Sequence, residues 1–590
     1  MANYSSKTKV PVAVKTRSSM DLSHITIKSQ DYGSVSPISC QYLVPGDEFN
    51  IKVSEFTRVL PMVNPTFAKV DSVVRGFVVP INYIWKQFNE FISGNVVSNV
   101  FNSGSAITPN APYFTASTLR TAFFSSSNGL VEVLPTDEGY DFVNRGDTDN
   151  IYYKLTLKGR KVYNTLVSLG YNLNFNTSSD GTAYDAIYSN VKLSALPLFA
   201  MWKFYLDWIV PSRFLDQFRV QMSIINGSYN LPSNGVITYE CLSNLIKIDF
   251  DSFLDNDYFT AAWSEPNQYP NTDLPYPLLV YSNYPITDLT PSRTVGAYDS
   301  SGDLSSLAVQ SIGRLQSMIN RNMIAGDKIK DWLKVEFGIE PNLDSLQIST
   351  YLGMFRNTMR ISDIMSTADT EQSGGLPLGS YAGRAMVGGD GTFSYKAKQH
   401  CILILTHEII PKPLYYQGLH PVTQLVDKFD FFFPEYDNLG CRAIKKSELY
   451  SGTDISQSSG GEGFMNGIFG FAPQYANLKS GRDIVAGDFR LKSLENSMSS
   501  WFLGRKFTPN EVLNSTPNIN MTFCKVNGTT QASYDDMFAY QGTDVDHFYS
   551  LFDISIHANR PMVSISDALT LDEEMNDRKV SVSTNNNPNV

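Results

Sequence analysis

The sequence predicts a mainly β protein, either a β-sandwich or a jelly roll, with long loops between its strands. Three observations lead to this prediction. Stretches that alternate apolar and polar residues, as half-buried strands do, occur near both ends of the chain. Helical and turn-rich stretches lie between them, so one sheet system must be closed by the first and last segments. No internal repeat is visible, which argues against a propeller or a solenoid.

The clearest strand lies in YLVPGDEFNIKVSEF, residues 42–56, where a Pro-Gly-Asp turn precedes it. Its first apolar side chains fall on one face: Phe49, Ile51 and Val53. After Val53 the alternation slips, because Glu55 stands where an apolar residue is expected and Phe56 is apolar instead. We therefore expect a β-bulge or the end of the strand at this point.

The remaining elements follow from the same periodicity rules. Strands are expected at about 40–60, 68–80, 400–410, 428–436 and 547–561, and helices at 82–94, 195–211, 312–323 and 329–337. We expect β structure to resume at about residue 393. The predicted organisation is an N-terminal segment at 1–39, one β domain at 40–565 with insertions at about 95–190 and 264–390, and a polar C-terminal tail at 566–590.

The composition indicates a surface that becomes covered by partners. Only 18% of the 590 residues are charged, whereas 13% are aromatic, with 32 Tyr and 36 Phe. Interface centres are enriched in aromatic side chains and depleted of charge. On composition alone, an ordinary tyrosine-rich β protein is an equal alternative. The net charge of -11 is unlike that of a dedicated nucleic-acid binder, which is basic.

Cysteine usage and hydropathy indicate the compartment. The five cysteines show no C-x-x-C spacing, which favours reduced, buried thiols over a disulfide framework or a zinc site. The N-terminal residues lack an apolar core long enough for a signal peptide, so we expect synthesis in a cytoplasm. The apolar stretch at 195–211 is short for a membrane span and contains Lys203 and Asp207. We expect an amphipathic helix there and no membrane insertion.

No catalytic arrangement stands out, and we expect no catalytic residue, cofactor or metal. His407-Glu408 begins like a zinc-protease motif, but Pro411 stands where the second histidine is needed. The paired acids within 249–257 are more typical of solvated loops than of general acid–base pairs. DVDH, residues 544–547, offers oxygens to a calcium ion but lacks the EF-hand pattern.

A basic arm is the one candidate for contact with nucleic acid. The first 20 residues contain four basic residues and no acidic one: Lys7, Lys9, Lys15 and Arg17. Such a segment is typical of a mobile basic arm. A solvated tail with no partner is the alternative interpretation.

A family resemblance emerges from the opening strand onward. The segment 42–94 resembles the N-terminal signature of the major capsid proteins of the Microviridae, and of gokushoviruses in particular. The residues that carry it come in the family's order: Pro45, Gly46, Asp47, Arg58 and Trp85. Later motifs are similar in the same order: Leu196 and Pro197, Tyr258 and Phe259, Gly470 and Tyr475, and Arg490. NRPMV, near residue 559, resembles the family's closing motif, so the matches span about 40–565.

The resemblance implies a single viral jelly roll, an eight-stranded antiparallel β-sandwich or barrel whose long loop insertions contain several helices. Copies of the chain would form pentamers and then a T=1 icosahedral shell around single-stranded DNA. The motif residues would have structural roles. Further implied partners are a host surface receptor, a small basic DNA-packaging protein and a minor pilot protein. The protein would be made and assembled in the host bacterial cytoplasm and reside in the virion.

A different class of function is the alternative. The same strand pattern suits a carbohydrate-binding or glycosidase-like β-sandwich protein, or an adhesin. Residues 95–190 would then hold the site, and paired acids would do the chemistry.

Overall fold

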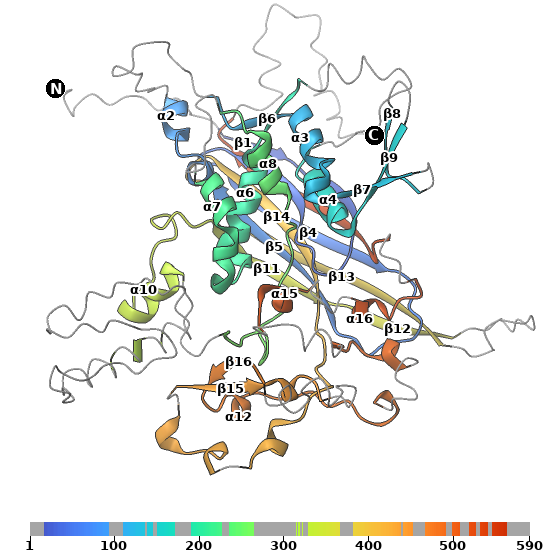
Figure 1. The fold of residues 1–590 in the computed structure, drawn as a ribbon. Coiled ribbons are helices and arrows are strands. Elements are labelled where there is room, and N and C mark those ends of the chain that lie inside the picture. The colour runs from blue at the N-terminus through green and yellow to red at the C-terminus, as the bar shows by residue number, and fades with distance from the viewer. Residues whose placement is uncertain are drawn as a thin grey trace, which may run out of the picture.

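The protein is mainly β, with antiparallel sheets and several helices (Figure 1). The computed structural model describes residues 17–93, 110–135, 139–145, 150–171, 190–226, 235–264, 314, 317–318, 321, 328–365, 381–426, 428–437, 440–451, 467–490, 498–507, 519–526, 532–540 and 545–562. Its two largest sheets pack face to face, as in a β-sandwich.

One sheet has six strands and joins the two ends of the chain. Its order is β1–β17–β4–β13–β12, and β2 also pairs with β17. The strands are β1 (Ser18–Asp21), β2 (His24–Gln30), β4 (Glu48–Val59), β12 (Arg360–Met365), β13 (Tyr381–Lys396) and β17 (Phe548–Arg560). All pairings are antiparallel. The prediction that early and late strands close one sheet is confirmed.

The other large sheet has four antiparallel strands in the order β11–β5–β14–β3. They are β3 (Ser36–Leu43), β5 (Val70–Pro80), β11 (Thr350–Thr358) and β14 (Cys401–Pro411). A continuous apolar core fills the space between the two sheets and includes Ile51, Val53, Val74, Val78, Leu403, Leu405, Ile554 and Ile556. The interdigitation of these side chains is the main source of stability in such a sandwich.

Helices cover the outer face of the four-stranded sheet, where α6, α7 and α8 lie in front of it in Figure 1. They are α3 (Ala116–Phe123), α4 (Leu157–Ser168), α6 (Leu196–Phe204), α7 (Arg219–Ile225) and α8 (Tyr239–Ile246). The rings of Phe77 in β5 and Phe204 in α6 stack with centroids 4.3 Å apart. Trp202 is fully buried and donates its indole hydrogen bond to the Leu245 carbonyl at 3.1 Å. The helix predicted at 195–211 therefore packs on the core, and a π-helical turn, η2 (Tyr205–Ile209), continues it.

The remaining helices and strands lie outside the two large sheets. They are α1 (Ile81–Ile84), α2 (Phe88–Ser93), β6 (Tyr113–Thr115), β7 (Val131–Leu134), β8 (Phe142–Arg145), β9 (Asn150–Leu155), β10 (Lys192–Ser194), α10 (Ile329–Phe337), β15 (Cys441–Lys445), β16 (Ile468–Pro473), α12 (Ala476–Lys479), α15 (Met521–Cys524) and α16 (Ala532–Asp535). We call the described residues between 419 and 490 the loop lobe. It contains β15, β16 and α12 and lies below the sandwich in Figure 1, in orange.

The bulge or strand end expected after Val53 is wrong. β4 continues to Val59, and its register with β17 runs without a shift. Glu55 keeps its inward position and is almost fully buried. Its carboxylate accepts hydrogen bonds from Thr57 at 3.0 Å and Asn357 at 3.1 Å, and another from Ser72. Because the core supplies these partners, the strand can place a carboxylate where the pattern required an apolar residue.

The expectation that β structure resumes only at about 393 is also wrong, because β11, β12 and β13 precede that point. β13 contains several glycines. A side chain at Gly391 would lie 1.9 Å from the Phe355 ring, and one at Gly389 would lie 2.4 Å from the Asn357 amide. These glycines therefore let β11 approach β13 closely within the sandwich.

Two further elements differ from expectation. The aromatic stretch 428–436 is not a strand but contains 3-10 turns, η6 (Lys428–Asp430) and η7 (Pro434–Tyr436), and no strand pairs with it. The helix expected at 82–94 is divided, because the backbone at Trp85 is extended between α1 and α2.

The helix at 329–337 is confirmed as α10, and it ends where Gly338 adopts a positive φ of 68°. The helix expected at 312–323 lies mostly outside the described residues.

Candidate assembly surface

Two motifs from opposite ends of the chain meet in the structure. Gly46 adopts a φ of 93°, which favours glycine and explains the Pro45-Gly46-Asp47 turn. Asp47 is fully buried, and its carboxylate accepts hydrogen bonds from the Val44 amide at 2.8 Å and the Arg560 guanidinium at 2.9 Å. Arg560 belongs to the NRPMV stretch. The ion pair therefore ties the beginning of the sheet to the end of its last strand.

A second group of motif residues anchors the loop lobe to the helical layer. Glu448 is buried, and its carboxylate accepts hydrogen bonds from Arg482 at 2.7 Å and from the Tyr258 hydroxyl at 3.1 Å. Arg442 approaches the same carboxylate at 3.5 Å. The Arg482 guanidinium also lies over the rings of Tyr258 and Phe259. Burial and the nearby charge of Glu448 raise the pKa of the Tyr258 hydroxyl, which therefore acts as a neutral donor.

Gly470 and Tyr475 shape the lobe at its attachment. A side chain at Gly470 would approach the Trp263 carbonyl to 3.0 Å, and the neighbouring Phe471 amide donates to that carbonyl at 2.8 Å. Tyr475 adopts a φ of 62°, uncommon for a residue with a side chain, and its hydroxyl accepts a hydrogen bond from the Phe433 amide at 3.1 Å. Both residues therefore hold the lobe's backbone.

The remaining motif residues do not gather at one place. Trp85 is buried beside α2, and Leu196 and Pro197 begin α6. Arg58 and Arg490 are exposed, and each guanidinium lies over a neighbouring aromatic ring. The motif is thus distributed over framework positions rather than around a cleft.

The predicted basic arm is described only at its end. Lys7, Lys9 and Lys15 lie outside the described residues. Arg17 lies directly before β1, and its guanidinium approaches the Glu48 carboxylate at 3.4 Å. Arg17 therefore has a protein partner at the edge of the six-stranded sheet.

The loop lobe exposes many large apolar side chains, which the sequence analysis did not single out. They are Leu419, Val422, Val426, Phe431, Phe432, Tyr436, Ile468, Leu478 and Ile484. Val426 and Ile484 are 81% and 79% exposed. Single exposed apolar residues are normal, whereas several within one small region are typical of interaction surfaces. The aromatic run at 428–436 was the one available signal, and it was interpreted as an aromatic strand.

The paired acids of the alternative, enzymatic interpretation have structural partners. Asp251 pairs with Lys161 at 3.0 Å and with Lys525 at 2.8 Å. Asp255 pairs with Arg356 at 2.9 Å, and Asp257 accepts backbone hydrogen bonds in its own turn. These acids hold loops together. A pocket of about 400 Å³ lies nearby, and two of its charged groups, Arg75 and Glu408, pair with each other at 2.7 Å.

The cysteines were expected to be buried thiols, but only Cys241, Cys401 and Cys524 are buried, whereas Cys40 and Cys441 are half-buried. All five are free thiols: Cys40, Cys241, Cys401, Cys441 and Cys524. Burial raises the pKa of Cys40 and of Cys401 to about 12, which keeps both protonated. In the part of the chain that the structure describes, no helix is both long and apolar enough to cross a bilayer.

Comparison with known proteins gives these features a context. The family model described as "Capsid protein (F protein)" of phages matches residues 8–126 and 299–570. The chain belongs to this phage capsid-protein family. It is 22% identical to the capsid protein VP1 of Chlamydia phage 1, over 88% of this chain and 91% of that protein. It is also 22% identical to the capsid protein VP1 of Bdellovibrio phage phiMH2K, over 90% of this chain and 92% of that protein.

Family membership confirms the resemblance to Microviridae major capsid proteins. The chain is a major capsid protein of a small phage, with a structural role and a place in the virion. Copies of it assemble into a capsid. The carbohydrate-binding or glycosidase-like alternative is not favoured.

Proposed function

We propose that this capsid protein forms the T=1 icosahedral shell of a single-stranded DNA phage, and that its eight long strands act as one jelly roll. The strand order supports the jelly roll, since β2–β17–β4–β13 lie in one sheet and β3–β14–β5–β11 in the other. The consecutive strands β2, β3, β4 and β5 alternate between these sheets. Two Greek keys folded into a double sheet produce this alternation.

The proposed domain division follows the strands. One jelly-roll domain spans about 40–565, with β1 and β2 contributed by the segment 1–39. The insertion at about 95–190 carries α3, α4 and the sheet of β7, β8 and β9. The second insertion ends before β11, at about 349 rather than 390. The tail at 566–590 lies outside the described residues.

The loop lobe is the proposed contact surface between copies of the chain. The outer face of the four-stranded sheet is already covered by helices, whereas the lobe's apolar side chains have no cover within the described chain. A second copy is the proposed partner, because each subunit of a capsid is surrounded by identical subunits. Closed symmetry then lets many moderate contacts add up to a stable shell, by way of pentamers. Permanent interfaces of this kind bury on the order of 2,000 to 5,000 Å² each.

Charged substitutions in the lobe test this surface. The double variant Val426→Asp and Ile484→Asp places two carboxylates where apolar groups would be desolvated, which is costly without a partner charge. We expect folded subunits that form no particles in electron micrographs or sucrose gradients. Ile27→Asp is the matched control, because Ile27 is 77% exposed but lies on β2, far from the lobe in sequence. Normal particles from the double variant would refute the proposed surface.

The basic arm is the proposed contact with the genome. Its three lysines precede β1, and a local cationic contact suits a chain of net charge -11 that surrounds a polyanion, although counterions and aromatic stacking would serve the same purpose. A small basic DNA-packaging protein is a further proposed partner for the same reason. A pilot protein and a host receptor complete the proposed set, and assembly would take place in the host cytoplasm.

Deletion of residues 1–16 tests the arm without removing β1, which begins at Ser18. We expect particles that contain less DNA and lose it more readily as the salt concentration rises. The matched control replaces Lys7, Lys9 and Lys15 with Gln and keeps the arm's length. Unchanged DNA content and particle stability in both variants would show that the arm does not contact the genome.

A further inference from the structure

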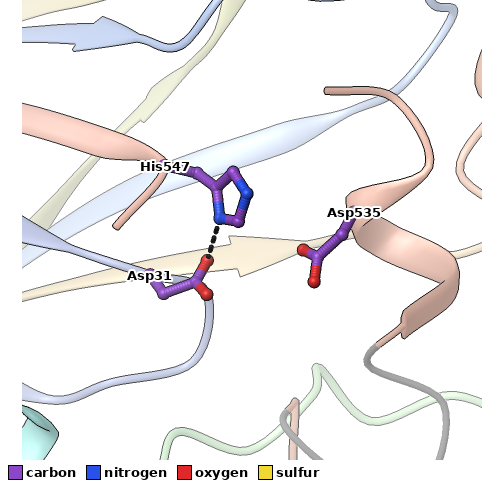
Figure 2. A group of neighbouring side chains, drawn as sticks. All are labelled: Asp31, Asp535 and His547. Atoms are coloured by element: carbon purple, nitrogen blue, oxygen red, sulfur yellow. Dashed lines mark hydrogen bonds and ion pairs between the residues drawn. The ribbon is translucent and has the colours of Figure 1, made fainter. Parts of the chain in front are cut away.

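Three segments far apart in the sequence bring two carboxylates and an imidazole together beside the sandwich. Asp31 follows β2, Asp535 ends α16, and His547 directly precedes β17. Figure 2 shows the three side chains pointing toward a common centre, with Asp535 facing the Asp31–His547 pair across a short gap. Asp31 and His547 are buried, and Asp535 is partly buried.

The distances suit ligands that share one metal ion. One ligand atom from each residue lies within 4.8 Å of the other two, and His547 Nδ1 is 3.1 Å from Asp31 Oδ1. Neighbouring ligands at about 2.1 Å from an ion are about 3.0 to 3.4 Å apart in octahedral or tetrahedral geometry. Asp31 and His547 already meet this spacing. A small inward movement of the Asp535 carboxylate would complete three ligands.

The Nε2 atom of His547 contacts a backbone carbonyl, as the second ring nitrogen does in many metal-binding histidines. Nε2 lies 3.1 Å from the Tyr540 carbonyl, to which it can only donate a proton. In the neutral imidazole this contact selects the tautomer whose Nδ1 carries the lone pair that a metal ion needs, an arrangement common among metal-binding histidines. The imidazole also stacks on the Phe538 ring, with centroids 4.2 Å apart, which fixes its plane.

An unpaired oxygen of Asp535 also indicates that a cation binds between these side chains. This atom, Oδ1, is buried and has no hydrogen-bond partner in the described chain. Protonation of His547 on both nitrogens would satisfy Asp31 and Tyr540 but would still leave Oδ1 of Asp535 unpaired. A cation between the three side chains satisfies all of them.

We propose that Asp31, Asp535 and His547 bind one divalent ion of the zinc or manganese class, which clamps the N-terminal β2 segment to α16 and β17. Imidazole nitrogen selects for transition metals over calcium and magnesium, and two carboxylates suit zinc and manganese alike. Water would fill the remaining positions. This inference does not depend on the proposed assembly surface, because the ligands all come from one chain.

Metal analysis of the full-length protein tests the clamp. After treatment with EDTA and dialysis, the protein is titrated with Zn²⁺, Mn²⁺ or Ca²⁺, and bound metal and thermal unfolding are measured. We expect one Zn²⁺ or Mn²⁺ per chain, and a rise in Tm of about 2 °C at a hundredfold excess of ion over Kd. With Co²⁺, the visible absorption should indicate nitrogen and oxygen ligands.

Asp535→Asn keeps the shape of the side chain but removes the charge, so it should fold and lose both the stoichiometric ion and the shift in Tm. Asp536→Asn is the matched control, because Asp536 is the neighbouring acid but is not one of the three clustered ligands. This variant should bind the ion as the unmodified chain does. Absence of stoichiometric binding, binding of Ca²⁺ alone, or undiminished binding by Asp535→Asn would each overturn the proposal.

Discussion

The sandwich and the loop lobe differ in how much of their apolar surface is buried within the chain. The two large sheets bury alternate side chains of every long strand in a shared core, and helices cover one outer face. The loop lobe buries a smaller set against the rest of the chain and exposes nine large apolar side chains. The space between the two sheets is thus filled within one chain, although the outer face of the six-stranded sheet also exposes apolar side chains such as Ile25 and Ile27. Among its described residues, the lobe has no comparable apolar core of its own, and we propose that a partner covers its exposed side chains. We propose that in a capsid this cover is another copy of the chain.

The largest expected effect on the free subunit comes from opening the ion pair between Asp47 and Arg560. Arg560→Ala leaves the fully buried Asp47 carboxylate without its cation, which should cost about 3–5 kcal/mol of unfolding free energy. Urea unfolding of unassembled subunits measures this loss. Arg490→Ala removes only an exposed cation–π contact and should cost less than about 1 kcal/mol. Equal losses in both variants would mean that the chain ends are not held by this pair.

A cavity in the sandwich should have the next largest effect. Leu403 is fully buried between the sheets, so Leu403→Ala should reduce the unfolding free energy by about 3 kcal/mol. The same urea titration provides the value. A loss below about 1 kcal/mol would indicate that the space between the sheets collapses easily, contrary to the packed core described above.

Acid should weaken the sandwich through the network around Glu55. Burial alone would raise the pKa of Glu55, but the hydrogen bond and charge of His407, with hydrogen bonds from Ser72 and Asn357, lower it to about 2. The stabilisation by the carboxylate is therefore complete above pH 4.5 and is lost as the pH falls toward 2, by about 3 kcal/mol. Burial lowers the pKa of His407, so its contribution is lost as the pH falls below 6.5.

The variant Glu55→Gln separates these two contributions. Thermal unfolding between pH 7 and pH 2.5 should show a shallower loss below pH 4.5 than in the unmodified chain, because the variant has no carboxylate to protonate. The loss that begins below pH 6.5, which comes from His407, should remain. An unchanged profile below pH 4.5 would show that the Glu55 carboxylate is not stabilised by the fold.

The smallest effect on the free subunit should come from the lobe. Leu478 is an exposed residue of α12, so Leu478→Ala should change the unfolding free energy of the subunit by no more than about 0.5 kcal/mol. The same substitution should raise the subunit concentration at which particles form, which light scattering measures. A large loss of subunit stability without any change in assembly would mean that Leu478 stabilises the folded subunit rather than the contact between copies.

The sequence predicted the strands that alternate cleanly, such as β4 and β17, because one-sided burial leaves a periodic pattern. It also predicted a helix at 195–211, but the expected amphipathic character is wrong, because this helix is buried on nearly all sides. It failed where a polar residue is satisfied inside the core or where two sheets approach closely. Glu55 and Gly391 are the clearest cases, since each depends on a partner far away in the sequence. The motif residues were found by resemblance, but the contact between Asp47 and Arg560 could not be, because it joins opposite ends of the chain.

The lobe was the most difficult part to predict. Its aromatic residues were noticed, but aromatic side chains in a buried strand and in an exposed contact surface look alike in sequence. Composition pointed to the same interpretation, since few charges and many aromatics are typical of surfaces that become covered. The exposed apolar side chains at residues 419–490, on which the proposed contact surface rests, are visible only in the structure.

The most direct test compares solvent access to the lobe in free subunits and in assembled particles, by hydroxyl-radical footprinting of the same protein. We predict that Val426, Phe431, Phe432 and Ile484 are readily oxidised in free subunits and strongly protected in particles, while Leu403 is protected in both states. Equal oxidation of these four lobe residues in subunits and particles would contradict the claim that copies of the chain cover the lobe.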